Sequence, residues 1–165
     1  MAMIDQLLTI KSFRERQAET ALHKTRVELA DAHRIEEDAE HDLHTFMRQA
    51  QEDEIRWFEE LCSRVVKLRD IEEVQTDVAI LRAEQAHKEQ ELEQAQARRA
   101  QAQSTFNQAT QVMKEATTAR EKFEELAQQH HAALGKEAER KEDLELEELA
   151  SIVREREELR MHADA

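Results

Sequence analysis

The chain has 165 residues and contains no proline, no tyrosine and one glycine, Gly135. Charged residues make up 38% of it and aromatic residues 4%, and many of its hydrophobic residues are alanines. A compact globular domain needs turn residues about every ten to fifteen positions, and they are missing here. The composition therefore excludes a thick apolar core and predicts an all-α protein, built of long helices that pack through a thin seam.

The charge balance bears on the kind of partner. The formal net charge is −14, whereas nucleic-acid binding depends on clustered cations that displace phosphate counterions. No apolar run approaches the roughly 20 residues that span a bilayer, and the start lacks the plan of a secretory signal. A lone Cys62 fits a reducing compartment. We expect a soluble, cytoplasmic protein with no nucleic-acid partner and no membrane insertion.

Two stretches carry a heptad pattern, in which positions that alternate by four and three residues line one helix face. The first seam consists of Ile4, Leu8, Lys11, Glu15, Ala18, Leu22, Thr25, Leu29, Ala32, Glu36, Ala39, Leu43, Phe46 and Ala50. The second consists of Val78, Leu81, Gln85, Lys88, Leu92, Ala95, Arg99, Ala102, Phe106, Ala109, Met113, Ala116, Arg120, Phe123 and Ala127. The two registers are out of phase, so a break between them is expected.

The segment CSRVVKLRDIEE supplies that break, although it holds neither glycine nor proline. Asp70, followed by Glu73, is a start signal in which the aspartate caps the new helix and the glutamate reaches back. We predict helix over about 3–62, a turn within about 63–69 and helix over about 70–134. The alternative is one helix that continues through this stretch.

A turn centred near residue 66 makes the chain a long antiparallel two-helix coiled-coil hairpin, a single elongated domain. The numbers of facing residues should then sum to roughly 133, which places Leu29 near Phe106.

The region around Gly135 lies where the first helix runs out as a partner. The glycine is either a C-cap or a weak point in a continuing helix, and we expect continuation with a kink. A helical extension over about 136–160 then follows. Its stripe of apolar residues has no helix left to cover it: Leu144, Leu149, Ile152, Val153 and Leu159. Such a stripe indicates a partner, and a solvated overhang or self-association is the alternative.

The sequence offers little support for a catalytic, metal or phosphate-binding site. His41 and His44 lie three apart beside acidic residues, a spacing that can chelate a metal, but no second ligand pair is evident. A single glycine cannot build a phosphate loop, and Cys62 has no cleft in which to act as a nucleophile. A two-helix protein offers no enclosed pocket that could tune a catalytic group. We predict a protein that is not an enzyme and uses no metal or cofactor.

The region around the turn holds more bulky apolar residues than the middle of either helix. They include Trp57, the only tryptophan, with Phe58 before the turn and Ile71, Val74 and Val78 after it. These side chains either pack on one another to close the hairpin or remain exposed as an aromatic anchor for another protein.

Several short stretches, in order, resemble the YscO/FliJ family of type III secretion proteins, and its YscO branch most closely. They are IKSFRERQAETA at 10–21, Arg56 and Phe58, DIE at 70–72, LRAE at 81–84 and KFEEL at 122–126. The resemblance covers all but about the last thirty residues. It implies a central stalk that docks in the hexameric secretion ATPase, links it to the export-gate protein and escorts secretion chaperones, in the cytoplasm beside the inner-membrane apparatus.

Carried onto this sequence, the resemblance assigns two groups of residues. Lys11, Arg14 and Arg16 would face the ATPase, since they form the most basic spot on an acidic chain. The candidates for the export gate or another partner are Trp57, Phe58, Ile71, Val74, Val78 and Leu81. Two alternatives stay open: a prefoldin-like holdase or general coiled-coil scaffold, and a homodimeric spacer.

Overall fold

The computed structural model describes residues 3–164 and contains two helices. Helix α1 spans Met3–Cys62 and helix α2 spans Leu68–Ala163, and residues 63–67 join them. The part of the chain that is described holds no β-strand. The predicted all-α fold, an antiparallel two-helix hairpin with a helical C-terminal extension, is confirmed.

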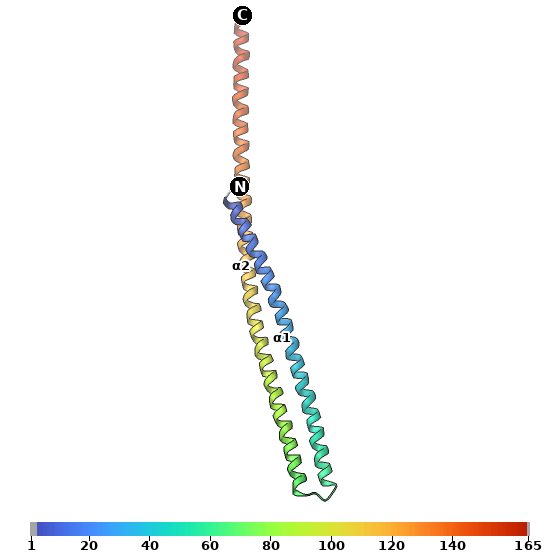
Figure 1. Cartoon of the computed structure of the whole chain (residues 1–165). Coiled ribbons are helices and arrows are strands. Elements are labelled where there is room, and N and C mark those ends of the chain that lie inside the picture. The colour runs from blue at the N-terminus through green and yellow to red at the C-terminus, as the bar shows by residue number, and fades with distance from the viewer. Residues whose placement is uncertain (1–2, 165) are drawn as a thin grey trace. The chain divides into compact units, whose positions relative to one another are not determined.

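The chain divides into two compact units, which are described separately below. The loop unit is Gln17–Met113 and holds the loop with the adjoining lengths of both helices. The terminal unit consists of Met1–Arg16 and Lys114–Ala165. In the loop unit, α1 and α2 run antiparallel on either side of the loop (Figure 1).

Burial follows the heptad pattern closely. All fourteen positions predicted from Ile4 to Ala50, and all fifteen from Val78 to Ala127, are at least partly buried. The buried hydrophobic residues among those described are all alanines: Ala18, Ala32, Ala50, Ala95 and Ala127. The larger seam residues are only partly buried, so little apolar surface is fully removed from water. The core is thin, as the composition predicts.

The loop that joins the helices is short and exposed. Residue Ser63 ends α1: its backbone N–H donates to the carbonyl of Glu59 at 3.1 Å, and its Oγ donates to the carbonyl of Glu60 at 2.8 Å. These bonds satisfy two groups of the last helical turn that have no partner inside the helix. Val65 follows with its side chain fully exposed.

The start of α2 differs from the prediction. The helix begins at Leu68, so Lys67 holds the N-cap position and Asp70 the third helical position. Asp70 Oδ2 accepts a hydrogen bond from the Lys67 backbone N–H at 3.0 Å. This is one of the two hydrogen bonds of a capping box, the one in which an acidic side chain in the first helical turn accepts from the N-cap residue. The assignment of Asp70 as the N-cap was therefore wrong, and Glu73 instead lies 3.7 Å from Arg69.

In the terminal unit, α2 continues without interruption through Gly135. Gly135 does not have a positive φ, so it is not the αL C-cap that would end a helix. A Cβ built at this position meets nothing within 4 Å. Every described residue from 128 to 164 is exposed. The part of α2 that follows Gly135 forms a helix with no other helix beside it (Figure 1).

Neither helix, over residues 3–164, holds a stretch that is long and apolar enough to cross a bilayer.

Candidate protein-binding surfaces

Charged residues inside the seam of the loop unit and beside it pair across the two helices. Arg82 lies 2.9 Å from Glu54, and the Arg99 guanidinium contacts the Glu36 carboxylate. The numbers of these partners sum to 136 and 135, close to the predicted 133. These charges are neutralised within the protein, so they are poor candidates for binding another molecule.

A second kind of contact in the loop unit places a cation over an aromatic ring. Lys88 Nζ lies 5.6 Å from the centre of the Phe46 ring. Both residues are seam positions, so the lysine stem adds to the packing while the ammonium group interacts with the ring face.

The terminal unit also holds ion pairs between the two helices. Arg120 lies 2.7 Å from Glu15 and 2.5 Å from Glu124. Its hydrogen bond to Glu15 raises the pKa of the Arg120 guanidinium above its usual value, so the group stays charged. His131 Nε2 lies 2.9 Å from Asp5 Oδ1. The Arg120–Glu15 and His131–Asp5 pairs join the N-terminal part of α1 to α2.

The three basic residues predicted to face an ATPase are not equivalent. Lys11 is partly buried, and its Nζ lies 5.3 Å from the centre of the Phe123 ring. Arg14 and Arg16 are exposed. The geometry thus separates one seam lysine from two surface arginines.

Two exposed apolar residues of α1 accompany the arginines, and the sequence pattern did not single them out. Ile10 is 47% exposed and Phe13 is 53% exposed. Ile10, Phe13 and Arg14 follow the spacing of three and four that places residues on one helix face. The signal was present in the IKSFR stretch, where two bulky residues occupy positions outside the seam. Arg16 is also exposed and lies on the flank next to Phe13, away from Arg14. We call Ile10, Phe13, Arg14 and Arg16 the basic-apolar patch.

The residues predicted around the turn fall into two groups. Val74, Val78 and Leu81 are partly buried, and so is Trp57. Phe58 and Ile71 are exposed, the former by 55%. Val78 and Leu81 are seam positions, so they contribute to the packing of the hairpin as well as to any surface.

Three further apolar residues near the loop are exposed: Ile55, Val65 and Leu68. Together with Phe58 and Ile71 they form what we call the loop-end apolar surface. The sequence predicts Val65 and Leu68 only as part of the turn, and their exposure follows from the position at which α2 begins.

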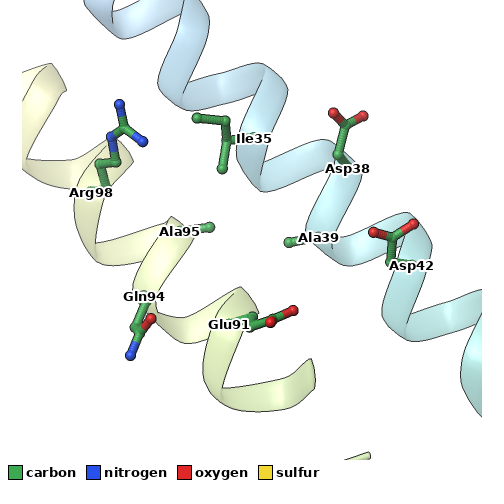
Figure 2. Close-up of a pocket in the computed structure, with 8 residues that line it drawn as sticks. All are labelled: Ile35, Asp38, Ala39, Asp42, Glu91, Gln94, Ala95 and Arg98. Carbon is green, nitrogen blue, oxygen red and sulfur yellow. The ribbon is translucent and has the colours of Figure 1, made fainter. Parts of the chain in front are cut away.

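A shallow hollow opens between the two helices in the loop unit (Figure 2). Its volume is about 440 Å³, and its lining residues are Ile35, Asp38, Ala39, Asp42, Glu91, Gln94, Ala95 and Arg98. The methyl groups of Ala39 and Ala95 point toward one another across the gap. The hollow exists because two alanines meet at this layer of the seam and leave the space between the flanking polar side chains unfilled.

The hollow does not resemble a site built for chemistry. It is an open depression with three carboxylates at its edge, whereas catalytic and cofactor sites are enclosed and largely apolar. Over residues 3–164 there is no group of three or more histidine, cysteine or acidic side chains placed to hold a metal ion.

Comparison with known proteins identifies the family. Residues 4–152 match the profile of the family described as Type III secretion protein YscO. The chain belongs to the YscO family. A crystal structure of Type III Secretion Protein YscO from Vibrio parahaemolyticus is similar, with a TM-score of 0.79 and 28% sequence identity. The similarity covers 88% of this chain and 92% of the Vibrio chain. No curated protein matches the chain in sequence.

Membership in the YscO family makes this chain a component of a type III secretion apparatus. The family assignment predicted from the short stretches is confirmed, and the similar crystal structure supports the hairpin.

Proposed function

We propose that this chain is a non-enzymatic coiled-coil stalk of the secretion apparatus, which docks in the hexameric secretion ATPase, links it to the export-gate protein and escorts secretion chaperones. The observation that carries the proposal is the match to the YscO family over residues 4–152. On this proposal the protein acts in the cytoplasm, at the periphery of the inner-membrane apparatus.

The basic-apolar patch is the proposed ATPase contact. Arg14 and Arg16 are exposed on a chain of net charge −14, so they stand out as a local cationic site. Arginine next to an exposed aromatic residue is a combination typical of interface hot spots. Phe13 would supply the apolar anchor, and the arginines would steer the patch toward an acidic surface. Lys11 would act indirectly, because its ammonium group already lies over Phe123.

The loop-end apolar surface is the proposed contact with the export gate. Exposed apolar side chains that gather at one place on a charged protein mark an interaction site. Phe58 and Ile71 are the exposed members of the predicted set, and Trp57, Val74, Val78 and Leu81 would support them from the seam.

The ATPase contact can be tested by binding of the full chain to the hexamer at low salt, followed with the ATPase rate. We expect the double variant Arg14→Glu/Arg16→Glu to bind about tenfold more weakly or worse, because it reverses two exposed charges. A matched control, Arg26→Glu/Arg48→Glu, reverses two exposed charges of α1 in the loop unit and should bind normally. Absence of binding by the unaltered chain would overturn the stalk proposal, and equal binding of both variants would overturn the assignment of the patch.

The gate contact has a test of the same design. Phe58→Ala/Ile71→Ala is expected to weaken binding to the cytoplasmic part of the export-gate protein. Met47→Ala/Ile80→Ala is the control, because it also removes one exposed apolar side chain from each helix of the loop unit. Equal binding by the two variants would show that the loop-end apolar surface is not the gate contact.

A prefoldin-like holdase is a second candidate, and the loop-end apolar surface is the observation that favours it. A holdase suppresses aggregation of an unfolded test protein in the absence of any ATPase. The stalk proposal predicts that the chain does not suppress aggregation when it is present at the same molar concentration as the test protein. Suppression of aggregation that is lost in the Phe58→Ala/Ile71→Ala variant would favour the holdase.

A further inference from the structure

We propose that the C-terminal part of α2 pairs with the same segment of a second copy of this chain, in antiparallel orientation. The segment is 138–163, which lies in the terminal unit and is exposed throughout. This proposal does not rest on the proposed function, because it uses only side chains of α2 in the terminal unit.

The segment carries its own heptad seam. Steps of four and three select Ala138, Glu142, Glu145, Leu149, Ile152, Arg156, Leu159 and Ala163. Residues at this spacing share one face of a helix and form the seam of a two-stranded coiled coil. Leu149, Ile152 and Leu159 are 59%, 48% and 69% exposed, so their apolar surface is largely in contact with water.

This seam is self-complementary when it is read against itself in the opposite direction. In an antiparallel pair whose residue numbers sum to 301, the facing residues are Ala138 with Ala163, Glu142 with Leu159, Glu145 with Arg156, and Leu149 with Ile152. The two alanines therefore face each other, the glutamate at 145 faces an arginine, and the two central aliphatic residues face each other. A two-fold axis repeats each of these contacts, as an isologous interface requires.

One neighbouring residue improves the least favourable pair. Glu142 faces Leu159, but Arg160 follows directly and lies on the flank that Glu142 occupies, since the two are five helical turns apart. In an antiparallel pair the same flanks of the two helices face each other, so Arg160 of one copy can reach Glu142 of the other. A parallel pair would instead stack Glu142 on Glu142 and Arg156 on Arg156, and like charges would oppose it.

The seam also continues an interface that already exists. Ala127 is buried where α1 covers α2 in the terminal unit, and Leu134, Ala138 and Glu145 follow at steps of seven, four and seven residues. These steps keep the residues on the same side of the helix. A second copy would thus cover the face of α2 beyond the reach of α1.

The first test is sedimentation equilibrium of the full chain over about 1–500 µM. We expect a reversible monomer–dimer equilibrium. Glu145→Arg alone and Arg156→Glu alone should each raise the dissociation constant about tenfold or more, because each places like charges at two points of the pair. The double variant Glu145→Arg/Arg156→Glu restores opposite charges and should return the dissociation constant to near that of the unaltered chain. Glu147→Arg, on the opposite face, should leave it unchanged.

The direction of pairing has a separate test. In a Cys62→Ser background, Glu145→Cys and Arg156→Cys should form a disulfide with each other when the two proteins are mixed under mild oxidation. Neither should link to itself, because antiparallel pairing separates identical positions by eleven residues, about 16 Å.

Three results would overturn the inference. A monomer over the whole concentration range would show that the segment does not self-associate. A dimer that is indifferent to the charge reversals, or in which the Glu145→Cys variant links to itself, would place the contact elsewhere or make it parallel. Protection of the segment from hydrogen exchange only when the secretion ATPase is added would assign the stripe to that protein instead of a second copy.

Discussion

The ion pair between Glu36 and Arg99 allows a prediction about stability. A single substitution should lower the free energy of unfolding, whereas substitution of both residues should raise it. Both residues occupy seam positions, where the heptad pattern calls for apolar side chains. The Glu36 side chain is 19% exposed and that of Arg99 is 35% exposed. Replacement of Arg99 by leucine leaves the carboxylate facing an apolar side chain with its charge uncompensated.

The cost of Arg99→Leu follows from this partial burial. Exposed ion pairs contribute about 0–1 kcal/mol, whereas removal of one partner from a buried pair costs about 3–5 kcal/mol. At 19% and 35% exposure we expect an intermediate loss, about 1–2 kcal/mol of unfolding free energy. The double variant Glu36→Leu/Arg99→Leu removes both charges and adds apolar burial. It should be more stable than the unaltered chain by about 1–3 kcal/mol.

Thermal and urea unfolding followed by circular dichroism measure both effects. For a chain of this length, 1 kcal/mol corresponds to roughly 2–4 °C in midpoint temperature. The control is Glu37→Leu/Arg48→Leu, which removes one acid and one base from exposed positions of α1 and should not stabilise the chain. If Arg99→Leu alone leaves the midpoint unchanged, the pair does not compensate charge in the seam. If the double variant is less stable than the unaltered chain, the two positions do not face each other.

Three further predictions concern single features. Asp70→Ala should cost about 0.5–2 kcal/mol by removing the bond to the Lys67 backbone N–H, with faster hydrogen exchange in the first turn of α2, while Asp70→Asn should lose less. Gly135→Ala should gain about 0.5–1 kcal/mol in helix stability by circular dichroism, because the position is helical and open; a loss would indicate a conformation that only glycine adopts. A hydrogen bond from Arg34 lowers the pKa of Asp31 below its ordinary 3.8, so its stabilisation is present above that value and is lost as pH falls through the lower folded value. Urea midpoints of Asp31→Asn should therefore fall less than those of the unaltered chain in that acid range, and parallel curves would refute the effect.

The burial pattern could be predicted from the sequence because it depends on a local periodicity. A heptad repeat determines which side of a helix meets its partner, whatever the details of the side chains. The pairing of residues followed from the position of the turn, and the observed sums of 135 and 136 differ from 133 by only two or three, with the loop lying over 63–67.

The start of α2 and the role of the polar seam residues could not be predicted in the same way. An N-cap is recognised in a sequence by a side-chain oxygen at the cap itself. Here a lysine holds that position, and an aspartate three residues later accepts the hydrogen bond. Glu36 and Arg99 each looked like an interruption of its own seam, because their pairing depends on the register between two helices that are distant in the chain. The exposure of Phe13 and Phe58 also depends on that register.

The register between the helices also explains why the sequence predicts the two candidate surfaces only in part. Lys11 shares a sequence cluster with Arg14 and Arg16, but its position in the heptad turns it toward Phe123. A cluster in the sequence is not a cluster on a helix, since neighbouring residues diverge by about 100°.

The charged residues within each seam have a mechanical consequence. Two helices that slide past one another by one heptad would bring Glu36 opposite Leu92 or Phe106, and would bring Glu15 opposite Met113 or Ala127. Each displaced position strands a charge against hydrocarbon, a far less favourable arrangement than the one observed. Neither unit therefore has a second register of its helices, one heptad away, that is equally favourable. The paired helices of each unit can therefore bend or rotate more easily than they can slide along one another.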